Sequence, residues 1–251
     1  MVTTSSNLSA VVIPAFNEAA TIAGIAQRAC QFTSMVIVVD DGSVDNTAQA
    51  LESLPVTVLN NPENIGKGKS ILRGVKHAIE QGAHSIITLD GDGQHQPEDI
   101  PLLLEKSLLH PNTIIIAARL RGRHTAPPLR RFANGFADFW ISWAAGQKIR
   151  DSQSGYRLYP AEVFQQCNTN SDKFVFESEI LIDAAHQGIF SKGVAIDTVY
   201  HKNSRASHYR PAADTWEIVM MVARKLILRG FYPRGLARSL GIRTQTPVHH
   251  P

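Results

Sequence analysis

Short apolar runs alternate with longer amphipathic stretches over the first half of the chain. Five runs carry apolar residues without polar alternation: residues 10–13, 35–39, 56–59, 85–89 and 113–118. Such runs predict strands buried on both faces, as in parallel sheets. Four stretches between them have helical patterns or helix-start signals: residues 19–32, 44–54, 69–81 and 97–109. Strands that alternate with helices predict an α/β chain with a doubly wound, mostly parallel sheet.

The pattern changes after the fifth apolar run. Residues 119–131 are basic, contain glycine and proline, and predict an irregular loop. Residues 194–200 predict a late strand, and residues 216–242 predict basic, amphipathic helix. We expect four parts along the chain: a disordered N-terminus at 1–9, one α/β domain at 10–213, a basic helical segment at 214–243 and a disordered tail at 244–251.

Composition limits the classes of function. The 251 residues are 43% hydrophobic, which is enough for a sizeable core. A formal net charge of +3 fits anionic substrates and is far from the strongly basic balance of a dedicated nucleic-acid binder, so we expect no nucleic-acid partner. Cys30 and Cys167 provide neither a disulfide framework nor zinc-binding spacing. No signal-peptide pattern precedes residue 10, and no apolar run reaches the roughly eighteen residues of a membrane span, so we expect a cytoplasmic protein.

The strand at residues 85–89 leads into the strongest candidate for chemistry. Asp90 and Asp92 follow it, one residue apart, and Gly91 and Gly93 let the backbone turn tightly. In open α/β sheets, ligands bind outside the carboxyl ends of the strands. Two carboxylates there suit Mg²⁺ or Mn²⁺, which take their remaining ligands from water and a substrate diphosphate. The alternative is that the Asp-Gly-Asp-Gly sequence is only a turn.

Two earlier loops also hold groups that a nucleotide would use. Asp40 follows the strand at 35–39, where its carboxylate would accept an N–H of a uracil or guanine base or, alternatively, cap the following helix. Lys67 lies in a loop rich in glycine and lysine and would meet a diphosphate, unless it is an ordinary solvated lysine. The loop is not a P-loop, because Glu63 stands where the motif requires a glycine five residues before Gly68.

Four segments, taken together, resemble the family 2 glycosyltransferases. They are Val12-Ile-Pro-Ala-Phe-Asn-Glu18, Val39-Asp-Asp-Gly-Ser43, Asn64-Ile-Gly-Lys-Gly68 and Asp90-Gly-Asp-Gly-Gln-His95. Within this family the chain is most similar to the dolichol-phosphate mannosyltransferase and polyprenyl-phosphate glycosyltransferase branch. The resemblance implies a GT-A catalytic domain, that is, a Rossmann-like, doubly wound, mostly parallel sheet with a mixed C-terminal portion. It also implies a nucleotide-sugar donor, Mg²⁺ or Mn²⁺, and transfer with inversion at the anomeric carbon.

Roles on the donor side are carried over residue by residue. The resemblance implies that these residues bind the donor: Pro14, Phe16, Glu18, Asp40 and Gln94. Asp40 would hold the base, and Asp90 and Asp92 would hold the metal on the donor diphosphate. A metal that bridges the phosphates stabilises the charge of the departing nucleoside diphosphate without proton transfer.

Further roles lie on the acceptor side. The resemblance implies that Arg119 and Arg131, or its neighbour Arg130, meet the phosphates of donor and acceptor through their guanidinium groups. Asp151 would lie nearest the acceptor, as a base or as an orienting group, and a phosphate acceptor would need little basic help. Three further residues match acceptor or loop positions of the family: Glu179, His208 and Arg210. His208 stands where relatives carry the lysine of a Ser-Lys pair.

Three neighbours of these residues have structural interpretations. His95 would order its loop through a hydrogen bond. Arg157 would pair with a carboxylate. Glu177 would meet the N-terminus of its helix favourably, because an acidic side chain there complements the helix dipole.

We interpret the chain as an inverting, metal-dependent hexosyltransferase. It would use a UDP- or GDP-sugar and a lipid-linked acceptor, either a polyprenyl phosphate or a lipid-like hydroxyl. One alternative is a nucleotidyltransferase, although the loop after the first strand lacks the expected glycine-rich, basic motif. The other is a catalytically idle domain that binds a nucleotide or a partner, although the acidic motifs are intact.

The C-terminal segment predicts contact with a membrane surface. Arg224, Lys225 and Arg229 are accompanied by apolar residues of the same segment: Met220, Leu226, Ile227, Leu228 and Phe231. A basic, amphipathic segment of this kind binds anionic lipid, here at the cytoplasmic face, as a peripheral protein does. The alternative is a helix packed on the sheet with its polar edge in solvent.

Overall fold

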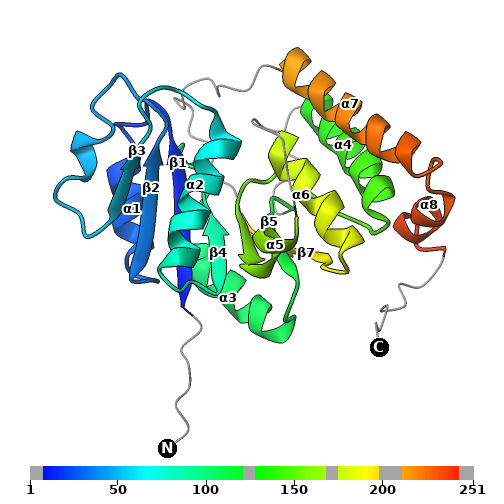
Figure 1. Cartoon of the computed structure of the whole chain (residues 1–251), viewed down its shortest axis with the longest axis horizontal. Helices are drawn as coiled ribbons and strands as arrows, with labels where there is room; N and C mark the ends of the chain where they lie inside the picture. The colour runs from blue at the N-terminus through cyan, green and yellow to red at the C-terminus, as the bar shows by residue number, and fades with distance from the viewer. Residues whose placement is uncertain (1–7, 121–127, 168–174, 198–210, 243–251) are drawn as a thin grey trace, which may run out of the picture.

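One seven-stranded sheet, covered by helices, organises the part of the chain that the structure describes (Figure 1). The structure is a computed structural model and describes residues 8–120, 128–167, 175–197 and 211–242. The strands are β1 (Ser9–Ala15), β2 (Met35–Asp40), β3 (Thr57–Asn60), β4 (Ser85–Thr88), β5 (Ile114–Ala118), β6 (Arg157–Pro160) and β7 (Ser191–Ala195). The α-helices are α1 (Ile22–Ala29), α2 (Lys67–Glu80), α3 (Ile100–Leu109), α4 (Pro128–Ala145), α5 (Glu162–Gln166), α6 (Val175–His186), α7 (Pro211–Leu228) and α8 (Pro233–Ser239). Two 3₁₀ helices, η1 (Gln49–Leu51) and η2 (Pro97–Asp99), complete the elements.

The sheet is parallel except for one strand. Its order is β3-β2-β1-β4-β6-β5-β7. β1 runs parallel to β2 and β4, β2 to β3, and β5 to β7. Only β6 is antiparallel, to both β4 and β5. The predicted mostly parallel sheet with a mixed C-terminal portion is therefore confirmed.

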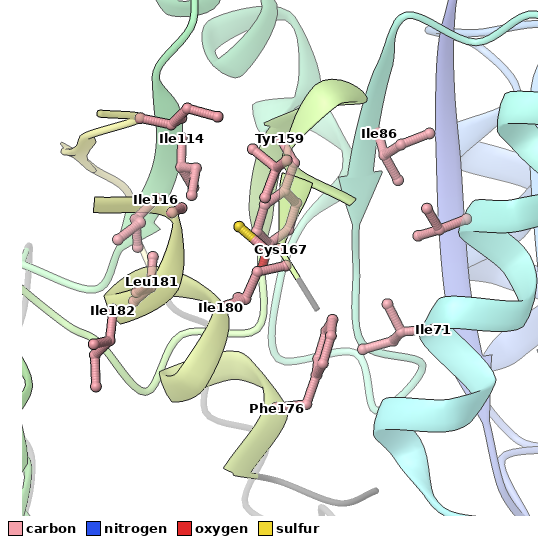
Figure 2. Close-up of a cluster of buried hydrophobic side chains, with 14 of the residues drawn as sticks. Ile71, Ile86, Ile114, Ile116, Tyr159, Cys167, Phe176, Ile180, Leu181 and Ile182 are labelled. Carbon is pink, nitrogen blue, oxygen red and sulfur yellow. The ribbon is translucent and has the colours of Figure 1, made fainter. Parts of the chain in front are cut away.

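Helices cover both faces of the sheet because successive strand residues point to opposite sides. Val12 of β1 belongs to a buried cluster with residues of α2, α4, α6 and α7, whereas Val11 and Ile13 pack with α1 and α3. Figure 2 shows part of the first cluster, in which Ile71 of α2 and Phe176 of α6 approach each other beside the strands. Burial on both faces explains why β1, β2, β4 and β5 read as continuous apolar runs, whereas the edge strands β3 and β7 have no buried residue.

The C-terminal helices pack against the rest of the protein through one face. α4 contacts α6, α7 and α8, and Figure 1 shows α4 and α7 lying side by side. Ile218, Val222 and Leu226 of α7 are buried in the first cluster. The helix expected at 216–242 is interrupted after Leu228, where Phe231 and Tyr232 have positive φ angles of 59° and 41°. Within the described residues, none of the helices combines the length and apolar character needed to cross a membrane.

The helix expected at residues 44–54 is wrong. Only the short 3₁₀ helix η1 forms there. Asp45 Oδ2 accepts the N–H of Ala19 at 3.3 Å, and Thr47 Oγ1 accepts the N–H of Glu18 at 2.9 Å. These side chains bond the loop after β1, and side-chain bonds of this kind compete with helix formation.

Two other boundaries differ from the sequence prediction. α4 begins at Pro128, so the end of the loop expected at 119–131 is helical; proline suits a first turn because its missing N–H needs no partner there. Residues 121–127 lie outside the described residues. β7 covers Ser191–Ala195, where it pairs with β5 with Ile114 opposite Ser191, so it begins before the strand expected at 194–200; residues 198–200 lie outside the described residues. β6 was not predicted as a strand.

Candidate active site

Several loops meet at one edge of the sheet. β1, β2 and β4 lie side by side in parallel, so their carboxyl ends point the same way. β6 runs the other way, and its first residue, Arg157, lies opposite Thr88 at the end of β4. The segment before β6 therefore reaches the same edge. This topology brings residues of the loops at 40–47, 89–96 and 151–156 together.

Hydrogen bonds join the loops after β1 and β2. The main-chain N–H of Asn17, which has a positive φ of 57°, donates to Ser43 Oγ at 2.8 Å. The N–H of Val44 donates back to Asn17 Oδ1 at 2.9 Å. These reciprocal bonds fix the loop that carries Phe16 and Glu18, two of the residues expected to line the nucleotide pocket.

The loop after β1 also contacts the glycine turn after β4. Thr21 Oγ1 donates to the carbonyl oxygen of Gly91 at 2.6 Å. A Cβ on residue 91 would lie 3.4 Å from the Pro14 carbonyl oxygen and 3.6 Å from Glu18 Cγ. The two loops therefore lie in contact with each other. The structure places Pro14 and Glu18 next to the turn that carries Asp90.

Asp40 and Asp41 end β2 and act differently. Asp40 Oδ1 accepts the N–H of Ser43 at 3.0 Å, so one oxygen of this carboxylate stabilises its own turn. Asp41 is 3% exposed and accepts the N–H groups of Ile65 and Gly66, each at 2.9 Å. Asp41 therefore holds the loop that leads into α2.

Lys67 is the first residue of α2, and its ammonium lies between two carboxylates. Nζ is 2.6 Å from Asp90 Oδ1 and 2.9 Å from Glu177 Oε1. Burial alone would lower the pKa of Lys67, but the two negative charges outweigh it and raise the pKa above its ordinary value. Burial would likewise raise the pKa of Asp90, and the Lys67 ammonium instead keeps it low. Asp90 is therefore ionised.

Asp92 is the second carboxylate of the pair. Burial and the negative charge of Asp90 raise the pKa of Asp92 above its ordinary value. Gln94 donates to it twice, from its main-chain N–H at 3.0 Å and from Nε2 at 2.8 Å. A divalent cation between the two carboxylates would offset the repulsion that raises this pKa, so the donor set fits Mg²⁺ or Mn²⁺. Since no group of three His, Cys, Asp or Glu side chains in the described part of the chain is arranged around a metal, the other ligands would be oxygens of water and substrate.

His95 lies buried beside this pair. It is 3% exposed, and its ring centroid is 5.4 Å from that of Tyr156. Burial lowers the pKa of His95 to about 4, although the nearby Asp90 opposes this. Its Nδ1 atom is buried without a hydrogen-bond partner among the described residues. The predicted loop-ordering hydrogen bond is therefore absent at this atom, and the neutral ring is held by packing.

Arg119 and Asp151 form a two-pronged ion pair at the end of β5. Arg119 Nε donates to Asp151 Oδ2 at 2.9 Å, and Nη2 donates to Oδ1 at 2.7 Å. The main-chain N–H of Arg119 also donates to Oδ2, at 2.7 Å. Burial would raise the pKa of Asp151, but the bonds to Arg119 lower it below its ordinary value. The carboxylate is ionised and fully engaged, so it is a weak proton acceptor.

A family model matches this arrangement of loops. The model described as glycosyl transferase family 2 matches residues 10–166, more than half of the chain. The chain belongs to glycosyl transferase family 2. The matched region runs from β1 to α5 and includes the carboxylates after β4 and the Arg119–Asp151 pair.

Relatives of this family 2 glycosyltransferase carry names that specify lipid-phosphate acceptors. The chain is 26% identical over 219 residues to the UDP-N-acetylglucosamine–dolichyl-phosphate N-acetylglucosaminyltransferase of Methanococcus voltae, with 78% of this chain and 87% of the relative covered. It is 27% identical over 192 residues to the polyprenol monophosphomannose synthase of Mycolicibacterium smegmatis, with 71% and 72% covered. The predicted branch of the family is confirmed.

A solved structure shows the same fold. It is glucosyl-3-phosphoglycerate synthase from Mycobacterium tuberculosis in complex with Mn²⁺, UDP and glucosyl-3-phosphoglycerate, with a TM-score of 0.69 and 17% identity over 88% of this chain and 80% of that one. At this identity the likeness shows the fold alone. The family 2 glycosyltransferase described here has the predicted GT-A fold.

The structure also separates residues that are close in the sequence. Glu177 contacts Lys67, whereas Glu179, two residues later on α6, pairs with Lys225 of α7 at 3.2 Å. Side chains two positions apart on a helix point in different directions. Glu177, and not Glu179, therefore lies beside Asp90.

The predicted carboxylate partner of Arg157 is wrong. Its guanidinium is completely buried and donates to the carbonyl oxygens of Ser154 at 2.7 Å, Ser152 at 2.8 Å and Glu177 at 2.5 Å. It also donates to Tyr159 Oη at 3.1 Å. Arg157 thus ties the segment before β6 to the start of α6.

The remaining expected residues lie at the edge of the site or beyond what is described. Arg131 is exposed in the first turns of α4. His208 and Arg210 lie outside the described residues. Three residues that the sequence interpretation did not place in the site hold it together: Asp41, Asp138 and Glu177. The partners of these three carboxylates come from other parts of the chain, so only the structure shows that they belong to the site.

Proposed function

We propose that this protein transfers a hexose, with inversion, from a UDP- or GDP-sugar to a polyprenyl phosphate. The observation that carries the acceptor class is the engagement of Asp151 by Arg119. A hydroxyl acceptor needs a group that takes up its proton, and a carboxylate with a lowered pKa is poorly suited to that task. A phosphate oxygen is already negatively charged and needs no such group. Arg119 would meet the phosphate through its guanidinium group.

The donor would bind across the loops after β1, β2 and β4. We assign the base to Asp40 and the nucleotide pocket to Pro14, Phe16 and Glu18. Pro14 and Glu18 lie beside the glycine turn. The relative from Methanococcus voltae is named for a UDP-sugar, and the solved synthase contains UDP and Mn²⁺. Both names support a nucleotide-sugar donor for this chain.

In the proposed reaction an oxygen of the acceptor phosphate attacks the anomeric carbon opposite the diphosphate. The new carbon–oxygen bond forms while the bond to the diphosphate oxygen breaks, and its electron pair leaves with the nucleoside diphosphate. Asp90 and Asp92 would hold Mg²⁺ or Mn²⁺, whose charge stabilises this leaving group. Gln94 keeps Asp92 in place through two hydrogen bonds. No proton has to be removed from the acceptor.

We further propose that α4, α7 and α8 contact an anionic membrane at its cytoplasmic face. These adjoining helices expose large apolar side chains: Phe132, Phe136, Phe139, Trp216, Met220, Ile227, Leu228 and Leu240. Phe132 and Leu228 are 73% and 74% exposed, respectively. Arg224 of α7 and Arg229, in the turn between α7 and α8, are exposed and complement the negative charge of such lipids. A lipid acceptor would be reached from this surface.

Two residues of the predicted membrane face point the other way. Leu226 is 3% exposed and lies in the core. Lys225 pairs with Asp183 of α6 at 2.6 Å. Both residues secure α7 to the protein because they lie on its inner side. Of the three basic residues named for the membrane surface, Arg224 and Arg229 therefore remain.

The test compares two acceptors that differ only in their phosphate. The purified protein is incubated with Mn²⁺, a panel of labelled UDP- and GDP-sugars, and either a short polyprenyl phosphate or the corresponding polyprenol. We expect transfer from one donor to the phosphate, with the opposite anomeric configuration by NMR, and none to the alcohol. Equal transfer to the alcohol contradicts the acceptor class. Donor binding without transfer to either acceptor supports the idle-domain alternative.

A further inference from the structure

Lys67 connects two carboxylates that come from different parts of the fold. Asp90 follows β4, and Glu177 lies in the first turn of α6, yet both approach the same ammonium at 2.6 and 2.9 Å. A Cβ on residue 155 would lie 2.7 Å from Glu177 Oε1, 2.8 Å from Asp90 Oδ2 and 2.9 Å from Lys67 Nζ. Gly155 therefore leaves the space in which the three charged groups meet.

The two carboxylates have different surroundings. Asp90 forms the candidate metal pair with Asp92. Glu177 is fixed from behind, because its carbonyl oxygen accepts Arg157 Nη1 at 2.5 Å and Arg157 is itself bonded to Ser152 and Ser154. The main chain of Glu177 is therefore held in place beside Lys67, away from the candidate metal pair.

A divalent cation and the Lys67 ammonium would compete for Asp90. The ammonium lies 2.6 Å from Oδ1, within the space that a cation bound to this carboxylate would need, and the two positive charges repel each other. A cation that binds Asp90 therefore weakens the hold of this carboxylate on the ammonium. Removing it from both carboxylates at once would leave Glu177 buried and unpaired, which is costly.

We propose that Glu177 is a positioning residue that retains Lys67 when a divalent cation takes Asp90. The ammonium then stays beside the metal site, where it can meet the donor diphosphate. Glu177 lowers the cost of metal binding because it provides the displaced charge with a partner. This inference rests on the proposed function, since it assumes a metal at Asp90 and Asp92 and a diphosphate donor.

The test is a double-mutant cycle on Mn²⁺ affinity, measured by calorimetry with UDP or GDP present and also with Mn²⁺ alone. In Glu177→Gln, Asp90 is the one carboxylate of the two that still pairs with Lys67, so the ammonium competes more strongly with the cation. Mn²⁺ should therefore bind roughly tenfold more weakly, a coupling typical of residues in contact. Lys67→Met removes the competitor, so Mn²⁺ alone should bind more tightly. In the Lys67→Met background, Glu177→Gln should have no further effect.

Glu179→Gln is the matched control. It makes the same change on the same helix but at a residue that pairs with Lys225, so Mn²⁺ affinity should stay as in wild type. If Glu177→Gln weakens Mn²⁺ equally with and without Lys67, Glu177 acts as a ligand or a distant charge, and the inference is overturned. If circular dichroism shows that Glu177→Gln does not fold, Glu177→Asp takes its place, with the same required dependence on Lys67. Wild-type protein that binds no Mn²⁺ contradicts the metal part of the proposed function instead.

Discussion

Asp138 of α4 accepts the main-chain N–H of Asp151 through Oδ2 at 3.0 Å. Its other oxygen accepts the N–H of Ser152 at 2.8 Å and the Ser152 hydroxyl at 2.7 Å. Asp151 has a positive φ of 55°, a conformation that a residue with a side chain rarely adopts. The helix proposed to face lipid therefore also shapes the turn that presents the partner of Arg119.

This relationship predicts the effect of Asp138→Ala. The change removes three hydrogen bonds from the turn, which should reduce the free energy of unfolding by about 2 kcal/mol and misplace Asp151 and Arg119. We expect the KM for polyprenyl phosphate to rise about tenfold. The Kd of the nucleotide-sugar should change less, because the hydrogen bonds of Asp138 go to Asp151 and Ser152, whereas the loops after β1, β2 and β4 would hold the base and the metal. Equal losses for donor and acceptor in calorimetry and steady-state kinetics contradict a local role.

Asp40→Asn separates base recognition from turn stabilisation. The amide oxygen can still accept the Ser43 N–H, but the charge is lost. If Asp40 holds the base, the Kd of the donor should rise by roughly ten- to a hundredfold, the effect of losing a charge-assisted hydrogen bond. The melting temperature should change little. If calorimetry shows unchanged donor affinity, Asp40 does not bind the base and its role is to stabilise the turn.

Asp92→Asn tests the metal pair. The neutral amide cannot hold a cation together with Asp90 as a second carboxylate does. Turnover should therefore fall by roughly a hundredfold or more, as when a group that stabilises charge in the transition state is removed. In wild type, Mn²⁺ with UDP or GDP should raise the melting temperature, because a ligand that binds only the folded state stabilises it. The variant should fold but show no such rise. A wild-type-like rise in the variant contradicts the site.

The strongest sequence patterns predicted the first five strands of the sheet. Five apolar runs without polar alternation correspond to β1 to β5. Four of these strands are buried on both faces and leave that signature, whereas the burial expected for residues 56–59 is wrong because β3 is an edge strand without a buried residue. β6 was missed because its four residues include the buried Arg157, whose carbonyl partners come from the turn before it and from α6. No pattern within four residues reports such partners.

The candidate site was predictable only in part, for the same reason. Asp90 and Asp92 stand out because their spacing and glycines are local. Glu177 joins Lys67 across 110 positions of sequence, and Asp138 reaches Asp151 from another element. The sequence favours a helix-terminal role for Glu177, since a residue's neighbours along the chain are visible and its neighbours in space are not.

His186 predicts how stability depends on pH. Its Nε2 lies 2.8 Å from the carbonyl oxygen of Ala144, and its ring is 5.5 Å from that of Tyr232, so it joins α6 to α4 and to the turn before α8. Burial and the charge of Arg229 lower the pKa of His186 below its ordinary value of 6.5. A group whose pKa is lowered by folding stabilises the protein fully above pH 6.5, and this contribution is lost as the pH falls through the folded-state pKa.

The free energy of unfolding should therefore decrease as the pH falls below 6.5, in part because of His186. His186→Gln keeps a donor for the Ala144 carbonyl but does not titrate. Urea denaturation between about pH 5 and pH 8 should give a flatter curve for this variant than for wild type. Parallel curves for the two proteins contradict the assignment.

Membrane contact gives the last prediction, and the structure decides which residues carry it. Arg224 of α7 and Arg229, which follows α7, are exposed, whereas Lys225 is engaged with α6. Each basic residue near anionic lipid contributes about 1 kcal/mol, and exposed apolar side chains such as Phe132 and Leu228 add to this. Several such groups together give reversible binding that salt weakens.

We expect wild-type protein to sediment with anionic liposomes at low salt and to be released at high salt. Arg224→Glu with Arg229→Glu should abolish sedimentation while donor binding, measured by calorimetry, is retained. The control, Lys76→Glu with Lys192→Glu, changes the net charge by the same amount at exposed lysines outside α4, α7 and α8, and should still sediment. If both double variants lose binding equally, the attraction depends on overall charge and not on this surface. If wild-type protein does not bind anionic liposomes yet glycosylates a water-soluble phosphate acceptor at full rate, the proposed membrane contact is contradicted.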